Sequence, residues 1–174
     1  MELNQAITLL QHPAIIKNDK QVWADLGSGE GLFSRALASL LAADSTIYAV
    51  DQNKSALQKI KQQQKVMIKT TYADFVKDDL AFHDLNGILM ANALHFVQDK
   101  TTLIKKLAGY CHKEHCFLIV EYDTDTPNPW VPYPLSFITL KQFFQQCGYK
   151  SVDKIHEVPS LYGRAKIYSA IIKP

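Results

Sequence analysis

Residues 23–31 read Trp-Ala-Asp-Leu-Gly-Ser-Gly-Glu-Gly, and they are the most informative stretch of the 174-residue chain. An apolar segment runs into three glycines (Gly27, Gly29 and Gly31), and a helical pattern begins directly behind them. Glycine lets a backbone turn sharply and approach a ligand closely. A second apolar segment ends in Asp51, roughly twenty residues further on, where an acid can accept hydrogen bonds from both hydroxyls of a ribose. Together the two features predict a nucleoside-binding crevice in an α/β sheet.

The spacing of the glycines restricts the kind of nucleoside. A dinucleotide fingerprint requires Gly-x-Gly-x-x-Gly, and Leu32 occupies the position of its third glycine. Asp25 lies two residues before the first glycine, where a carboxylate would repel a pyrophosphate but would suit the ammonium group of an amino acid. Both residues therefore argue against a nicotinamide-dependent oxidoreductase.

Asp-x-Gly-x-Gly-x-Gly at 25–31 resembles the cofactor loop of the class I S-adenosylmethionine-dependent methyltransferases. The resemblance continues in order through Asp51, the pair Asp74-Phe75 and Asn92, and it covers nearly the whole chain. It implies S-adenosylmethionine as the cofactor. By resemblance, the cofactor-binding residues are Asp25, Gly27, Ser28, Gly29, Asp51, Gln52, Asp74, Phe75, Ala91 and Asn92.

The resemblance also implies a role for each of these groups. The backbone of the glycine loop approaches the methionine part of the cofactor, and Asp25 helps to hold its amino group. Asp51 takes the ribose, with Gln52 beside the adenine. Asp74 accepts a hydrogen bond from the adenine amine, and Phe75 covers a ring face. Ala91 and Asn92 lie under the sulfonium. Without the resemblance, Asp74 is also compatible with an ordinary turn and Phe75 with a plain core position.

Helical and strand patterns alternate along the chain, which predicts an α/β fold with helices on both faces of a mostly parallel sheet. A capping box of Thr139 and Gln142 is expected to open the last helix. The resemblance implies a Rossmann-like three-layer sandwich, a single domain over residues 1–174, and the strand order 3-2-1-4-5-7-6 with strand seven antiparallel. The seven expected strands cover 21–26, 46–50, 66–72, 87–91, 116–121, 150–158 and 165–172.

The composition argues against several other classes of protein. The net charge is only +2, from 19 basic and 17 acidic residues, so no strong field favours nucleic acid or an anionic membrane. No apolar run is long enough to span a bilayer, and no secretory signal is expected. Three cysteines, an odd number, indicate a reducing compartment, and we expect the protein in the cytoplasm.

Methyl transfer needs a general base only if the acceptor is protonated at the working pH. Candidates for that role are His95, Tyr122, Tyr133 and Tyr162. His95 and Tyr133 are retained as catalytic candidates, although the apolar run around His95 favours a packed, supporting role. The proline-rich loop 126–135 carries Trp130 and Tyr133 and is expected to form one wall of the acceptor site, or simply to pack on the sheet.

Two further motifs are set aside. Asn128-Pro129-Trp130 is similar to the Asn-Pro-Pro-Tyr motif of methyltransferases that act on amino groups of bases and glutamine, but those motifs directly follow strand four. The run Cys111-His112-x-x-His115-Cys116 lacks a Cys-x-x-Cys pair, and its last two side chains would point to opposite faces. We therefore expect a solvated turn there and no metal site.

The sequence thus predicts a methyltransferase that acts on a small or medium organic molecule by in-line methyl transfer. Because we find no long insertion after strand four and no large N-terminal cap in this sequence, we expect the acceptor site to be either open or completed by a second subunit in a homodimer. Two alternatives stay open. One is a non-catalytic module that binds the cofactor or a partner protein. The other is a methyltransferase acting on protein or RNA, with the near-neutral charge weighing against RNA.

Overall fold

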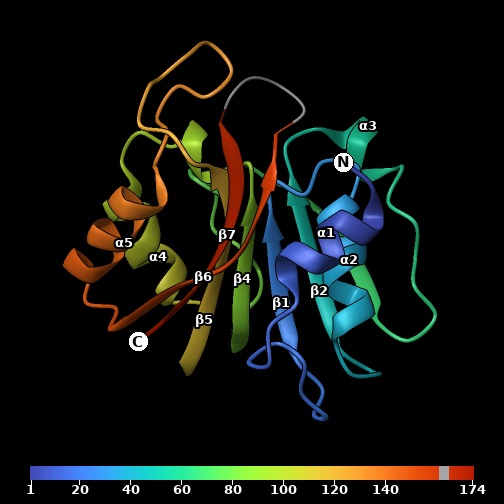
Figure 1. The fold of residues 1–174 in the computed structure, drawn as a ribbon. Coiled ribbons are helices and arrows are strands. Elements are labelled where there is room, and N and C mark those ends of the chain that lie inside the picture. Colours follow the sequence, from blue (N-terminus) through green and yellow to red (C-terminus); the bar gives the residue numbers. More distant parts are fainter. Residues whose placement is uncertain (161–164) are drawn as a thin grey trace.

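The computed structural model describes residues 1–160 and 165–174, and its strands form one seven-stranded sheet (Figure 1). The strands are β1 (Val22–Leu26), β2 (Thr46–Asp51), β3 (Met67–Tyr72), β4 (Leu85–Ala91), β5 (Cys111–Tyr122), β6 (Ser151–Pro159) and β7 (Lys166–Lys173). The helices are α1 (Leu3–Leu10), α2 (Leu32–Leu40), α3 (Lys54–Leu57), α4 (Lys100–Ala108) and α5 (Phe137–Gln146), with a 3₁₀ turn, η1 (Leu94–Phe96).

The strand order is β3-β2-β1-β4-β5-β7-β6, which confirms the predicted topology. The pairs from β3 to β5 are parallel, whereas β7 runs antiparallel to both β5 and β6. The order reverses between β1 and β4. In open α/β sheets, ligands bind outside the carboxyl ends of the strands at such a point.

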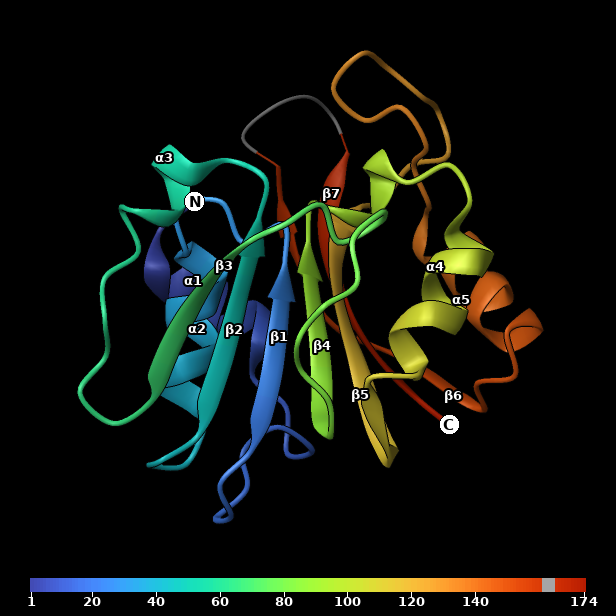
Figure 2. The same ribbon diagram turned by 180° about the vertical axis from the view of Figure 1, so that it is seen from behind.

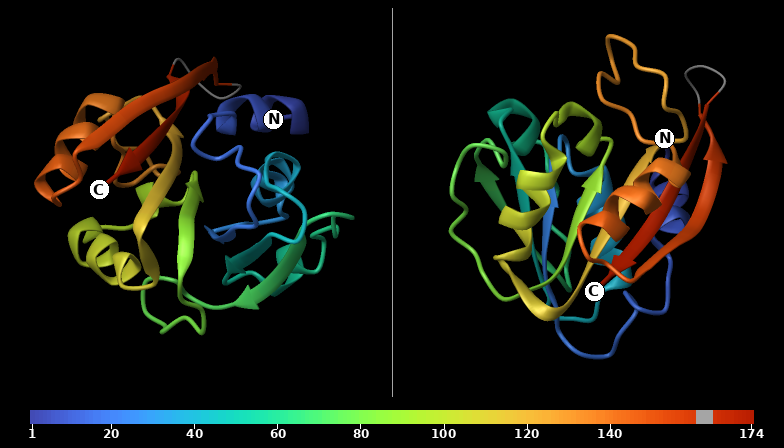
Figure 3. Two further views of the ribbon diagram at one scale, coloured as in Figure 1. Left: turned by 90° about the horizontal axis from the view of Figure 1, so that it is seen from below. Right: turned by 90° about the vertical axis from the view of Figure 1, so that its left-hand side faces the viewer.

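Helices cover both faces of the sheet, as predicted. Alternate side chains of β4 enter different cores: Ile88 packs with residues of α4 and α5, and Leu89 packs with residues of α1 and α2. Figure 2 shows α4 and α5 in front of the sheet, and Figure 3 shows the twisted sheet between the two helical layers. Burial on both faces explains why β4 carries no polar side chain from Gly87 to Ala91.

The carboxyl ends of β1, β2 and β4 lie at the top of Figure 1, where η1 and the loop 123–136 also lie. The glycine loop follows β1, Asp51 ends β2, and Asn92 follows β4. The topology therefore brings together three segments that are far apart in the sequence.

Two local expectations were wrong. Helix α5 begins at Phe137, and its N-cap is Ser136, whose Oγ accepts a hydrogen bond from the Thr139 N–H at 3.3 Å. The run from Cys111 to Cys116 belongs to β5 and is not a solvated turn, because Leu85 pairs with Cys111 before the register shifts. No described helix has the length and apolar character to cross a membrane.

Candidate functional site

The glycine loop is folded back against β2. The N–H groups of Gly27 and Ser28 both donate to the Val50 carbonyl, at 2.9 and 3.0 Å. Gly27 has φ +76°, and a Cβ there would lie 2.7 Å from the Ala93 Cβ. Both the backbone conformation and the lack of space therefore require a residue without a side chain. Gly29 has φ +53°, but a Cβ there would meet no atom within 4 Å. The loop is thus packed against protein at Gly27 and open at Gly29.

Asp51 holds the loop and the start of α3 together. Its Oδ2 accepts from the Gly29 N–H and its Oδ1 from the Asn53 N–H, both at 2.8 Å. Each carboxylate oxygen can accept a second hydrogen bond. The carboxylate is therefore fixed by the backbone and still has acceptor capacity for two hydroxyl groups.

Asp25 is buried at the end of β1. Its Oδ2 accepts a 2.5 Å hydrogen bond from the Ser34 hydroxyl, whereas its Oδ1 has no hydrogen-bond partner among the described residues. Burial raises the pKa of Asp25 to about 7, with the nearby Asp51 charge acting in the same direction. A cation or a hydrogen-bond donor placed beside this carboxyl would relieve an unfavourable burial.

Two further buried polar atoms in this region lack hydrogen-bond partners within the described chain, Ser28 Oγ and Asn92 Oδ1. Asn92 has φ +52°, a conformation that asparagine tolerates better than most residues. Buried polar groups are normally satisfied, and an unsatisfied one requires an explanation. Here the orphaned atoms come from the ends of β1 and β4, at the point where the strand order reverses.

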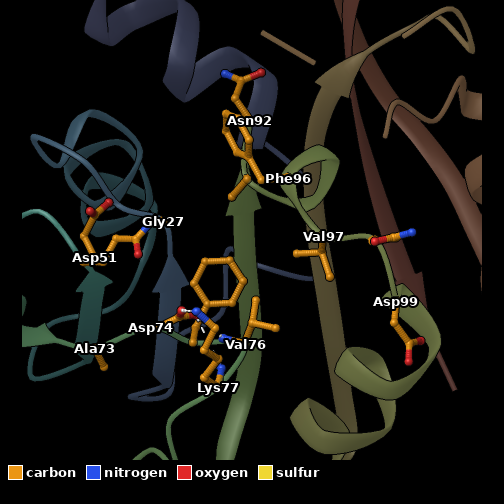
Figure 4. A pocket seen from close by; sticks show the side chains of 14 residues that line it. Gly27, Asp51, Ala73, Asp74, Val76, Lys77, Asn92, Phe96, Val97 and Asp99 are labelled. Atoms are coloured by element: carbon orange, nitrogen blue, oxygen red, sulfur yellow. Dashed lines mark hydrogen bonds and ion pairs between the residues drawn. The ribbon is translucent and has the colours of Figure 1, made fainter. Parts of the chain in front are cut away.

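A cavity of about 610 Å³ is lined by Asn92 and by Gly27, the neighbour of Ser28, and its volume is within the range typical of small-molecule sites. In Figure 4, Gly27 and Asp51 lie on one side, Asn92 and Phe96 on another, and Asp74 and Lys77 below them. The described lining residues are Gly27, Asp51, Gln52, Ala73, Asp74, Phe75, Val76, Lys77, Asn92, Ala93, Phe96, Val97, Gln98 and Asp99.

Asp74 organises the turn that forms the lower edge of this cavity. Its Oδ1 accepts from the Val76 N–H at 3.0 Å, and its Oδ2 forms an ion pair with Lys77 at 3.2 Å. Burial opposes ionisation, but hydrogen bonds from Lys77 and Val76 outweigh it and lower the pKa of Asp74. Asp74 is therefore a charged acceptor at the cavity edge as well as a turn residue. Phe75, next to it, is partly buried against the core.

His95 lies behind the cavity, not on its surface. Only 3% of its side chain is exposed, and its Nδ1 lies 2.6 Å from Oε2 of Glu121, which is 2% exposed. Its neighbour Phe96 is 60% exposed and lines the cavity. Tyr133 donates its backbone N–H to the His95 carbonyl at 3.0 Å, which joins the loop 123–136 to this segment.

The structure brings six of the predicted cofactor-binding residues to the cavity surface: Gly27, Asp51, Gln52, Asp74, Phe75 and Asn92. The other four lie next to these residues. Asp25, Ser28 and Gly29 belong to the end of β1 and the glycine loop, which Asp51 holds through Gly29. Ala91 precedes Asn92, and its side chain packs towards α1 and α2. Tyr122 ends β5, with its ring centroid 6.2 Å from that of His95. Tyr162 lies outside the described residues.

Sequence reasoning missed Glu121 and Lys100, two buried charged residues next to His95 and Val97. A signal for Glu121 was present, because it is a charged residue at the end of the apolar run Phe117–Val120. Within the described residues, no three His, Cys, Asp or Glu side chains come together as a metal site.

Comparisons with known proteins identify a family and similar folds. A family model described as a methyltransferase domain matches residues 24–113. No curated protein matches the sequence. The 1,6-didemethyltoxoflavin-N1-methyltransferase of Burkholderia thailandensis, solved with 1,6-didemethyltoxoflavin and S-adenosylhomocysteine, superposes with a TM-score of 0.72 and 16% identity, over 98% of this chain and 77% of that one.

Two other solved structures have similar folds. An S-adenosylmethionine-dependent methyltransferase from Archaeoglobus fulgidus gives a TM-score of 0.72 at 12% identity, covering 99% of this chain and 95% of its own. Magnesium protoporphyrin IX methyltransferase of Synechocystis, solved with bound S-adenosylmethionine, gives 0.68 at 12%, covering 97% and 77%. At such identities these structures establish the fold alone.

Proposed function

This chain belongs to the methyltransferase domain family, and from that premise we propose that it transfers a methyl group from S-adenosylmethionine to a small or medium organic acceptor. We also propose that residues 1–174 act as one domain. The observation that carries the proposal is a group of buried polar atoms without hydrogen-bond partners among the described residues, Asp25 Oδ1, Ser28 Oγ and Asn92 Oδ1. They lie at or next to the loop and strand ends that border a cavity edged by Asp51.

The residues at the cavity fit the parts of this cofactor. The carboxyl of Asp25 suits the ammonium of the methionine part. The free space beside Gly29 lets the cofactor come close to the backbone of the loop. Asp51 has free acceptor capacity for the two ribose hydroxyls, and Asp74 and Phe75 offer an acceptor and a ring for the adenine.

The cofactor, when bound, supplies a methyl group made electrophilic by a positive sulfur. What the chain must supply is alignment of the acceptor with that methyl group, because holding reactants in line contributes most of such a rate enhancement. Phe96, exposed at the cavity, is placed to contact an acceptor, and Trp130 and Tyr133 lie on the loop that is joined to the same segment. His95 is a candidate base only if its ring becomes accessible, and we propose a supporting role for it.

Calorimetry with purified protein tests the cofactor first. We expect S-adenosylhomocysteine to bind and NAD to give no heat, and a protein that ignores S-adenosylhomocysteine would contradict the proposal. Methyl transfer from labelled S-adenosylmethionine to a panel of phenols, amines, thiols and carboxylic acids then tests turnover. A protein that binds the cofactor but methylates none of them would favour a non-catalytic module, whereas transfer to protein or RNA would replace the proposed acceptor class.

A further inference from the structure

The wall of the cavity that follows β4 depends on a buried charged residue from the neighbouring strand. This pocket wall, residues 94–97, comprises η1 and Val97. Phe96 and Val97 face the cavity, whereas Leu94 and His95 face the interior. A 3₁₀ turn of this length has few hydrogen bonds of its own, so other groups must hold it.

Glu121, near the end of β5, supplies two of the contacts that hold the wall. Its Oε1 accepts from the His95 backbone N–H at 3.1 Å, and its Oε2 lies 2.6 Å from the His95 ring Nδ1. Both oxygens of one carboxylate therefore bind one residue, which fixes the backbone and the ring together. Because the pair is buried, these hydrogen bonds are stronger than they would be in water.

Lys100 holds the other end of the wall. Its Nζ donates to the Val97 carbonyl at 2.7 Å, and its side chain is buried next to the ring of Tyr133, whose centroid lies 5.5 Å from Nζ. Burial lowers the pKa of Lys100, while the negative charge of Glu121 opposes that shift. Two buried side chains of opposite charge, one from β5 and one from α4, thus fix the wall between them.

The same wall anchors the loop 123–136. The Tyr133 N–H donates to the His95 carbonyl, so His95 uses its N–H and ring towards Glu121 and its carbonyl towards the loop. Within the loop, Asn128 and Val131 exchange backbone hydrogen bonds at 3.1 Å, which closes the turn that presents Trp130, 82% exposed. A shift of His95 would therefore move Phe96 at the cavity and the aromatic loop together.

We propose that Glu121 is the positioning residue of this site: through His95 it sets one wall of the cavity that would hold the cofactor and the acceptor, and it links that wall to the loop 123–136. The inference rests on the proposed function for the identity of the ligand, but the linkage between wall and loop does not depend on any ligand. The role of the buried His95–Glu121 pair would then be to position the wall and the loop, and not to transfer a proton.

The test compares Glu121→Gln with Glu114→Gln, a matched control on an exposed position of the same strand. Glutamine is nearly isosteric but cannot accept from both His95 groups as a carboxylate does. We expect Glu121→Gln to weaken S-adenosylhomocysteine binding by about 5- to 30-fold, the size expected when a charge-assisted hydrogen bond is lost. The control variant should bind as the wild type does, and equal affinity of the two folded variants would overturn the proposal.

Amide hydrogen exchange followed by NMR supplies a readout without ligand. Glu121→Gln should accelerate exchange of the His95 and Tyr133 amides, while amides in the centre of β1 and β4 keep their protection. A general loss of protection would indicate a merely structural role, and unchanged exchange at Tyr133 would refute the linkage. If Glu121→Gln does not fold, Glu121→Asp, which keeps the charge but shortens the reach, is measured in its place with the same criteria.

The two proposals fail separately. If wild-type protein does not bind S-adenosylhomocysteine, the proposed function is wrong, and the exchange of the Tyr133 amide alone decides whether Glu121 links wall and loop. If the wild type binds but Glu121→Gln and Glu114→Gln bind equally, only the role of Glu121 is wrong.

Discussion

Replacing Asp25 by asparagine should change how the stability of the ligand-free protein depends on pH. Asp25 is buried, one of its oxygens has no hydrogen-bond partner among the described residues, and burial raises its pKa from 3.8 to about 7. Between these values the folded protein keeps a proton that the unfolded chain has lost. Stability therefore falls as pH rises through this window, and the loss is complete above the folded pKa.

The magnitude follows from the size of the shift. A difference of about three pKa units corresponds to about 4 kcal/mol at most, since each unit is worth about 1.4 kcal/mol. Asp25→Asn removes this titration. The difference in unfolding free energy between the wild type and the variant should thus move in favour of the variant by up to about 4 kcal/mol from pH 4 to pH 8.

Urea unfolding at a series of pH values measures this difference directly, because contributions of all other groups are common to both proteins. S-adenosylhomocysteine should bind the variant more weakly than the wild type at pH 8, since its ammonium group no longer meets a carboxylate. If the difference in unfolding free energy between the wild type and the variant does not change from pH 4 to pH 8, the pKa of Asp25 is not raised in the folded protein and the reasoning is refuted. Unchanged affinity at pH 8 would refute its role towards the ammonium.

Three further predictions concern the same site. Gly27→Ala should cost about 2–4 kcal/mol of stability, because a side chain there disfavours the left-handed backbone and contacts Ala93, whereas Gly29→Ala should cost about 1 kcal/mol. Chemical denaturation measures both values, and equal stabilities of the two variants would contradict this reasoning. Gly29→Val should abolish cofactor binding, which calorimetry measures. Asp51→Ala should weaken S-adenosylhomocysteine binding by about 1–3 kcal/mol through unpaired buried hydroxyls, and equal affinity by calorimetry would refute the ribose assignment. Once an acceptor is known, His95→Gln should keep a substantial fraction of kcat, since glutamine can still form a hydrogen bond. A loss of about 100-fold or more, together with the disappearance of a step in the pH–rate profile, would make His95 the base.

The sequence by itself determined the parts of the fold that local chemistry controls. Three glycines after an apolar run and an acid at the end of the next one predicted the loop, and the alternation of helical and strand patterns predicted the parallel sheet. All three glycines have positive φ in the structure. The strand order came from the resemblance and is confirmed. Asn53 and Asp99 cap α3 and α4 and accept hydrogen bonds from the Ala56 and Thr102 N–H groups. Caps of this kind can be read from a sequence because they depend on residues only three apart.

Only the tertiary structure decided the features that depend on pairing between distant segments. Strand β5 starts at Cys111 because Leu85 pairs with it, and nothing near Cys111 in the sequence reveals that partner. Glu121 binds His95 although they are 26 residues apart, since β4 and β5 are adjacent and end at the same edge. Burial of both side chains follows from packing, which the residue types alone would not predict, because charged side chains are normally exposed unless a partner compensates them.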